Sequence, residues 1–168
     1  MTIFMRFKSL WLNFLMVLII IAFDQGTKIF FDSYLFYEIP QPVFPGFNLT
    51  LLHNTGAAFS LWAHGNAWQS WFLLAVSASM CIAIPVWLFR QTHTRSALAI
   101  GLTLVLAGAL SNLVDRVTLG YVVDFLDFYI GSWHWPAFNV ADSSIVLGVI
   151  FALWGDDKIC WLRPSRQR

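Results

Sequence analysis

Apolar residues are concentrated in four long runs, and most polar residues lie between the runs or at their ends. The runs predict helices over approximately residues 9–31, 68–89, 96–117 and 137–156. A bilayer core of about 30 Å is crossed by about 20 helical residues, so each predicted helix is long enough to span a membrane. The pattern therefore predicts a mainly α-helical membrane protein with four transmembrane helices.

The two long connections between these helices fall on one side of the predicted membrane. Residues 32–67 contain several Pro and Gly residues, followed by a mixed run that predicts short antiparallel strands, with Asn54-Thr55-Gly56 as a turn. Residues 118–136 are rich in aromatic side chains, which are typical of the membrane interface. We therefore expect a small external β-rich cradle and an external interfacial loop.

Composition agrees with the membrane class. Of the 168 residues, 58% are hydrophobic and 11% are charged, and the mean hydropathy is +0.67, whereas soluble domains have about half apolar and about a quarter charged residues. Four helices and their connections account for the chain, which predicts a single integral-membrane domain over residues 1–168.

Positive charge is distributed unevenly between the two sides of the membrane. Eight of the ten Lys and Arg residues fall on the side opposite the long connections. Cytoplasmic segments are enriched in Lys and Arg, so both termini are predicted in the cytoplasm and the cradle outside. The basic C-terminal tail is interpreted as a topology determinant, and nucleic acid is not expected as a partner.

Polar side chains gather at three helix ends that share the external side. They are Asp24 and Lys28 at the end of the first helix, Asn112, Asp115 and Arg116 at the end of the third, and Asn139 and Asp142 at the start of the fourth. Charged groups within a membrane are costly and usually functional. Their common depth predicts an active site near the outer leaflet.

Asp124 and Asp142 are the first candidates for chemistry. Asp124 lies in the second external segment and Asp142 about one turn into the fourth helix, so folding of that segment can bring them face to face. Two carboxylates that share one proton form an acid–base pair. Simpler interpretations remain open, because Asn139 and Asp142 have the spacing of a helix capping box and Asp127 competes with Asp124 three residues later.

The remaining polar residues have structural interpretations of similar weight. Asp24 and Lys28 are four residues apart on one helical face and are expected to pair. Asp115 is expected to form structural ion pairs. Asn54 and Asn112 are suited either to hydrogen-bond a peptide backbone or to brace loops.

Other classes of function fit less well. The zinc motif H-E-x-x-H, the nucleophile elbow G-x-S-x-G and the nucleotide-binding fingerprints do not occur, so neither a metal nor a cofactor is predicted. A metal site formed by Asp124, Asp127 and Asp142 is an alternative. A proton-coupled transporter is the second hypothesis, although the inner halves of the helices lack titratable groups for a relay. A purely structural membrane subunit is the third.

Five short motifs follow one another along the chain. They are D-Q-x-x-K at residues 24–28, N-x-G-A-A-F at 54–59, N-x-x-D-R at 112–116, G-Y-V-V-D-F at 120–125 and W-P-A-F-N-x-A-D at 135–142. In this series the chain resembles the lipoprotein signal peptidases, the type II signal peptidases of bacteria, over its whole length. One departure is Ser111, which stands where family members often have Gly.

The resemblance implies that Asp124 and Asp142 form a catalytic dyad, in preference to Asp127. It also implies one set of supporting or substrate-binding residues and one set of structural polar residues. The first set is Asn54, Gly56, Asn112, Arg116 and Asn139, and the second is Asp24, Lys28 and Asp115.

The resemblance further implies a monomeric aspartyl endopeptidase of the bacterial inner membrane. The expected substrates are diacylglyceryl-modified prolipoproteins, cleaved just before the lipidated cysteine, and globomycin is the expected inhibitor. Membrane lipids are the other expected partners. Small residues on the third helix, Gly101 and Gly108 among them, are expected to let a helix or an acyl chain approach closely.

Overall fold

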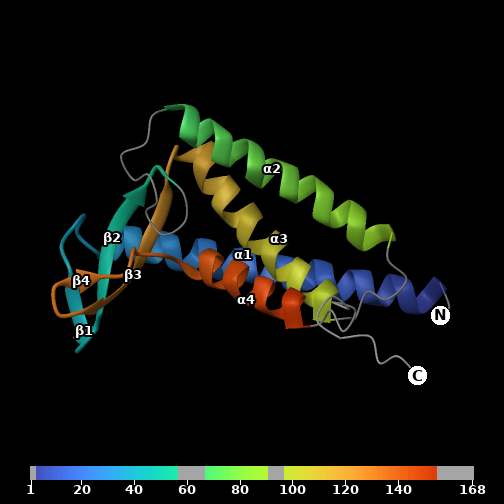
Figure 1. The fold of residues 1–168 in the computed structure, drawn as a ribbon, viewed down its shortest axis with the longest axis horizontal. Coiled ribbons are helices and arrows are strands. Elements are labelled where there is room, and N and C mark those ends of the chain that lie inside the picture. The colour runs from blue at the N-terminus through green and yellow to red at the C-terminus, as the bar shows by residue number, and fades with distance from the viewer. Residues whose placement is uncertain (1–2, 57–66, 91–96, 155–168) are drawn as a thin grey trace, which may run out of the picture.

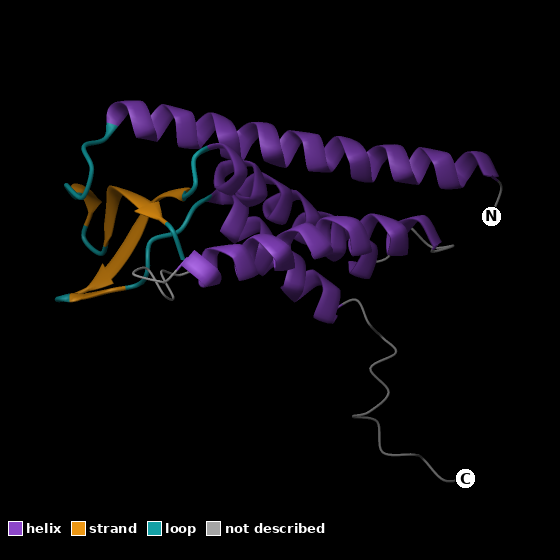
Figure 2. Ribbon diagram, turned by 90° about the horizontal axis from the view of Figure 1, so that it is seen from above, coloured by secondary structure: helices purple, strands orange, loops and turns teal. Residues whose placement is uncertain are grey.

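The helices extend from a small sheet, which lies at one end of the molecule in both views (Figures 1 and 2). The computed structural model describes residues 3–56, 67–90 and 97–154. The helices are α1 (Ile3–Tyr34), α2 (Ala67–Arg90), α3 (Ala97–Thr118) and α4 (Val140–Trp154). The prediction of a mainly helical chain with a small antiparallel sheet is confirmed.

Three of the helices are long and apolar enough to cross a membrane by length and composition. They are α1 over Leu10–Tyr34, α2 over Trp71–Arg90 and α3 over Ala97–Thr118. Helix α4, Val140–Trp154, is a shorter apolar helix of 15 residues. Helix α1 continues three residues past its predicted end at 31, and α4 begins at Val140 and not at 137, because Asn139 caps its first turn.

The sheet has the order β1-β2-β3-β4, and all its paired strands are antiparallel. Its strands are β1 (Gln41–Phe44), β2 (Phe47–Asn54), β3 (Val122–Ile130) and β4 (Trp133–His134). Of the short antiparallel strands expected in the first external segment, β2 lies in the predicted run, and β1, with which it pairs, lies before it. The prediction of an interfacial loop in the second external segment is wrong in part, because β3 and β4 occupy much of that segment. The β-branched and aromatic residues there favour a strand. Their aromatic content alone indicated only a membrane interface.

A bulge interrupts the pairing of β2 with β3. Leu49 pairs with Leu126 and Leu52 pairs with Asp124, so two residues of β2 lie opposite one residue of β3. Such a bulge bends the strand and changes which side chains face each other beyond it. It lies immediately before the part of the sheet that carries Asp124.

Helix α3 is the centre of the helical part and packs against α1, α2 and α4. Its contact with α4 is close enough to exclude side chains, since a Cβ atom at Gly101 would lie 2.5 Å from the carbonyl oxygen of Gly148. A Cβ atom at Gly108 would collide with the carbonyl oxygen of Ala141. The predicted close approach at small residues of the third helix is therefore confirmed for a neighbouring helix.

Candidate active site

The chain brings Asp124 and Asp142 into one buried site where the sheet meets the helices. Asp124 lies on β3 and is 1% exposed, and Asp142 lies in the first turn of α4 and is 4% exposed. Phe138, just before α4, hydrogen-bonds to β3 in both directions with Leu126, at 2.9 and 3.1 Å. This short bridge holds the start of α4 beside the strand that carries Asp124.

Asn139 connects the two acids. Its side-chain Oδ1 accepts a hydrogen bond from the Asp142 backbone N–H at 2.9 Å, and its own backbone N–H donates to Asp142 Oδ2 at 3.3 Å. These two bonds form the predicted capping box. The side-chain Nδ2 of Asn139 also donates to Asp124 Oδ1 at 2.7 Å. The capping interpretation and the site interpretation therefore describe the same residues.

Two further asparagines each donate to one acid. Asn54, at the end of β2, donates from Nδ2 to Asp124 Oδ2 at 2.8 Å. Asn112, on α3, donates from Nδ2 to Asp142 Oδ1 at 2.9 Å. Neutral amides therefore orient both carboxyl groups, while Lys28 and Arg116 act on them electrostatically from nearby.

Arg116 and Gly56 hold the turn that carries Asn54. The backbone N–H of Gly56 donates to Asn54 Oδ1 at 2.9 Å, which is the side-chain turn expected from the Asn-Thr-Gly sequence. Arg116 Nη2 donates to the Gly56 carbonyl oxygen at 3.2 Å. Arg116 therefore links α3 to the turn.

Asp24, Lys28 and Asp115 form a second buried cluster. The Lys28 ammonium lies 2.7 Å from Asp24 Oδ2 and 2.7 Å from Asp115 Oδ2, so the predicted pairing of Asp24 with Lys28 is present. Lys28 also donates to Asn112 Oδ1 at 2.8 Å. The backbone N–H of Ala141 donates to Asp24 Oδ1 at 2.7 Å, which ties this cluster to the first turn of α4.

Two members of this second cluster were not predicted as site residues. Gln25 Nε2 donates to Asp115 Oδ1 at 2.7 Å and to Ser111 Oγ at 3.0 Å. Ser111 Oγ in turn donates to Asp24 Oδ2 at 2.7 Å. Gln25 belongs to the D-Q-x-x-K motif, which is a signal that points to it, whereas no motif in the sequence indicates a role for the Ser111 hydroxyl group.

The electrostatics of the site favour a shared proton. Burial raises the pKa of Asp124, and the neighbouring Asp142 carboxylate raises it further. Hydrogen bonds from Asn54 and Asn139 act in the opposite direction, and the pKa of Asp124 is about 8. A carboxyl group that keeps its proton near neutral pH can serve as a general acid.

Asp127 lies apart from the pair. It is three residues beyond Asp124 on β3, so its side chain projects from the opposite face of the strand. There it is bound by Asn48 and Thr50 of β2 and by His134 of β4.

Within residues 3–56, 67–90 and 97–154, no group of three or more His, Cys, Asp or Glu side chains is arranged to hold a metal ion.

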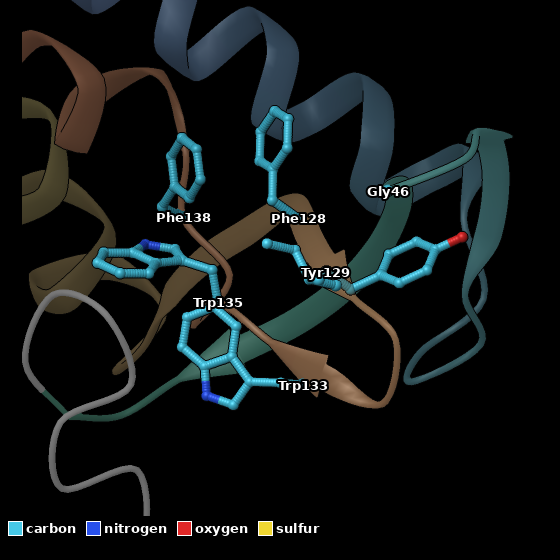
Figure 3. A pocket seen from close by; sticks show the side chains of 7 residues that line it. Gly46, Phe128, Tyr129, Trp133, Trp135 and Phe138 are labelled. Atoms are coloured by element: carbon cyan, nitrogen blue, oxygen red, sulfur yellow. The ribbon is translucent and has the colours of Figure 1, made fainter.

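An open apolar pocket of about 440 Å³ lies on the β3–β4 side of the sheet (Figure 3). Most of the residues that line it are aromatic. The lining residues are Gly46, Phe128, Tyr129, Ile130, Trp133, Trp135 and Phe138. Exposed tryptophans of this kind are typical of the membrane interface.

Comparison with known proteins relates the chain to a family. It matches the family model of signal peptidase (SPase) II over residues 16–155. It is 41% identical to the lipoprotein signal peptidase of Polynucleobacter necessarius subsp. necessarius over 152 residues. These residues make up 90% of this chain and 93% of the relative. A lipoprotein signal peptidase of Acinetobacter baumannii is 44% identical over 144 residues, 86% of this chain and 81% of the relative. A solved bacterial membrane enzyme has a TM-score of 0.75 and 29% identity, covering 93% of each chain.

Proposed function

The chain belongs to the signal peptidase II family, and we propose that Asp124 and Asp142 are the catalytic pair with which it removes signal peptides from prolipoproteins. The observation that carries the proposal is their arrangement. Both are buried, Asn139 bonds to both, and Asn54 and Asn112 each orient one of them.

The proposed reaction is general acid–base hydrolysis by a pair that holds one proton. The ionised carboxylate takes a proton from water, the water oxygen attacks the scissile carbonyl carbon, and the protonated carboxyl group gives its proton to the carbonyl oxygen. When the C–N bond breaks, the proton taken from water passes to the leaving amine. One hydroxyl group of the intermediate returns its proton to the other carboxylate, so that a carboxylic acid is released and the pair again holds one proton. The apparent titration belongs to the pair and not to either residue alone.

The supporting residues are assigned roles by their contacts. Asn54 and Asn139 hold both oxygens of Asp124, so that its carboxyl group has one orientation. Arg116 holds the turn beside Asn54 through the Gly56 carbonyl. Lys28, between Asp24 and Asp115, stabilises the helix ends on which the pair is built.

The proposed setting is the bacterial inner membrane, in one domain over residues 1–168. We infer that α4 is the fourth span, that both termini are cytoplasmic and that the pair lies near the outer leaflet. The aromatic pocket of Figure 3 and the apolar outer faces of the helices, such as Ile82 at 69% exposure, support this depth. The substrate's diacylglyceryl chains then lie among lipids and helices while the peptide bond before the lipidated cysteine reaches the pair.

The test is cleavage of a diacylglyceryl-modified prolipoprotein by the purified protein in detergent. We expect cleavage just before the lipidated cysteine, inhibition by globomycin, indifference to a chelator and activity as a monomer. Asp124→Asn and Asp142→Asn are each expected to lower the rate by at least about 1000-fold while remaining folded.

Asp127→Asn is the matched control, because it removes a buried carboxylate from the same strand. It is expected to keep most of the activity. Substantial cleavage by either dyad variant would overturn the assignment, and loss of cleavage with the chelator would move the acids to a metal site.

A further inference from the structure

Asp127 is a buried acid that the proposed mechanism does not use. It is 5% exposed, and its carboxylate is bound by three side chains from two neighbouring strands. Asn48 Nδ2 and Thr50 Oγ1 donate to Oδ2 at 3.1 Å each, and His134 Nδ1 lies 2.8 Å from Oδ1. Burial raises the pKa of Asp127, but the hydrogen bonds from His134, Asn48 and Thr50 outweigh burial and hold its pKa below the usual value.

These contacts lie across the bulge of β2. Asn48 is the direct partner of Asp127 in the ladder before the bulge, whereas Thr50 lies in the irregular stretch between Leu49 and Leu52. One carboxylate oxygen therefore binds a residue of the regular ladder and a residue of the bulge. A bond of this kind resists movement of the extra residue along the strand.

The register beyond the bulge decides whether Asn54 reaches Asp124. There Leu52 pairs with Asp124 and Asn54 pairs with Val122, so Asn54 and Asp124 lie on the same face, two positions apart. Loss of the bulge shifts the register by one residue, and such a shift moves every side chain of a strand to the other face. Asn54 would then point away from Asp124.

We propose that Asp127 is a positioning residue: by binding Asn48 and Thr50 it fixes the bulge of β2 and so the hydrogen bond from Asn54 to Asp124. The inference rests on the proposed function, because it concerns the orientation of a catalytic carboxyl group. His134 belongs to the same network and holds the short strand β4 against Asp127.

Two substitutions of Asp127 separate its shape from its charge. Asp127→Asn keeps an oxygen that accepts from Asn48 and Thr50 and is expected to have kcat within about threefold of wild type, whereas Asp127→Leu removes every acceptor. For Asp127→Leu we expect kcat to fall about tenfold or more with KM within about twofold, because the reacting group is misplaced and the substrate site is kept.

The pH profile supplies a readout that a merely structural role does not change. The hydrogen bond from Asn54 lowers the pKa of Asp124. Loss of this bond therefore raises the pKa, and the high-pH limb of the profile, where activity declines, moves to higher pH. The charged groups around Asp124, namely Asp142 on α4, Lys28 on α1 and Arg116 on α3, stay in place. Asp127→Leu and Asn54→Ala are therefore expected to shift the limb in the same direction, and the double variant to add little to Asn54→Ala.

Matched variants keep the test decisive. Thr50→Val removes one of the two bonds between Asp127 and β2 without adding volume. We expect it to move the high-pH limb in the same direction by a smaller amount. It tests the positioning role if Asp127→Leu does not fold. Asp32→Leu removes a carboxylate that also contacts a histidine, His53 at 3.2 Å, but at an exposed site, and is expected to leave kcat and the limb unchanged.

The inference and the function fail differently. An unchanged kcat and pH limb in folded Asp127→Leu and Thr50→Val would overturn the positioning role, as would full additivity with Asn54→Ala. Absence of cleavage by wild type, or full activity in Asp124→Asn, would instead overturn the proposed function.

Discussion

Two clusters of buried carboxyl groups lie side by side in this protein, and they differ in what faces them. Asp24 and Asp115 share the ammonium group of Lys28, at 2.7 Å from each. Asp124 and Asp142 are equally buried, but amide donors orient them and each acts electrostatically on the other. The first arrangement stabilises charge, and the second keeps a proton available. Burial of an acid alone therefore does not distinguish a structural role from a catalytic one.

Asn112 connects the two clusters. Its Oδ1 accepts from Lys28 at 2.8 Å, and this bond orients the amide so that Nδ2 donates to Asp142 at 2.9 Å. The ion-paired cluster thus fixes the direction of a donor to Asp142.

Removal of the cation should affect the fold more than any other change. Lys28→Met leaves Asp24 and Asp115 buried without their counter-ion, and breaking a buried ion pair in this way costs about 3–5 kcal/mol. Thermal unfolding in detergent is the measurement, with Asp124→Asn as the control that removes a charge from the other cluster. Equal unfolding temperatures for Lys28→Met and wild type would show that the two clusters do not differ as described.

Gly108→Ala should disturb both clusters at once. The added Cβ collides with the carbonyl oxygen of Ala141, whose N–H binds Asp24 and whose neighbour is Asp142. Overpacking of this kind costs about 1–3 kcal/mol, and we expect both the unfolding temperature and the cleavage rate to fall. Gly26→Ala is the control on α1, since a Cβ there meets nothing within 4 Å. Equal behaviour of the two alanine variants would contradict the close packing of α3 on α4.

The pH dependence should separate the pair from the ion cluster. With a pKa of about 8 for Asp124, the shared proton is lost above that pH, and the cleavage rate should fall about tenfold per pH unit there. The folded state binds this proton between the ordinary pKa of an aspartate and about 8, where the unfolded state does not. Stability therefore decreases as pH rises through that range.

Asp124→Asn should abolish this part of the pH dependence of stability, because it has no proton to lose. Unfolding followed from pH 5 to pH 9 in the variant and in wild type is the measurement. An unchanged slope in the variant would assign the titration to another group.

Much of this site was predictable from the helix ends alone. Asp24, Lys28, Asn112, Asp115, Asn139 and Asp142 lie at three ends of apolar helices, and antiparallel helices place such ends at one depth. Spacing also predicted the capping box of Asn139 and Asp142, because it depends only on residues three apart. What spacing could not decide was the choice between Asp124 and Asp127, since the two acids are equivalent until the strand directs them to opposite faces.

The part of the fold that was not predicted depends on long-range pairing. The sequence of β3 predicts an interfacial loop, because its aromatic residues suit both a strand and a membrane surface. Its pairing with β2 joins residues that are far apart in the chain, for example Asn48 with Asp127, 79 positions apart. The bulge that sets the register leaves no local mark in the sequence. The contacts that Asn48, Thr50 and His134 make with the Asp127 carboxylate depend on that pairing, so they could not be inferred without it.

Ser111 should give the smallest effect and the sharpest separation of the two clusters. Its hydroxyl group donates to Asp24 and accepts from Gln25, and both partners belong to the cluster of Asp24 and Asp115. Ser111→Ala removes these bonds and keeps helix propensity, so we expect a loss of about 1 kcal/mol in the free energy of unfolding and a cleavage rate within about twofold of wild type. Ser111→Gly should lose about 0.5–1 kcal/mol more, because glycine disfavours a helix interior. A tenfold fall in kcat for Ser111→Ala would show that the ion cluster takes part in catalysis, and the distinction between the two clusters would then have to be given up.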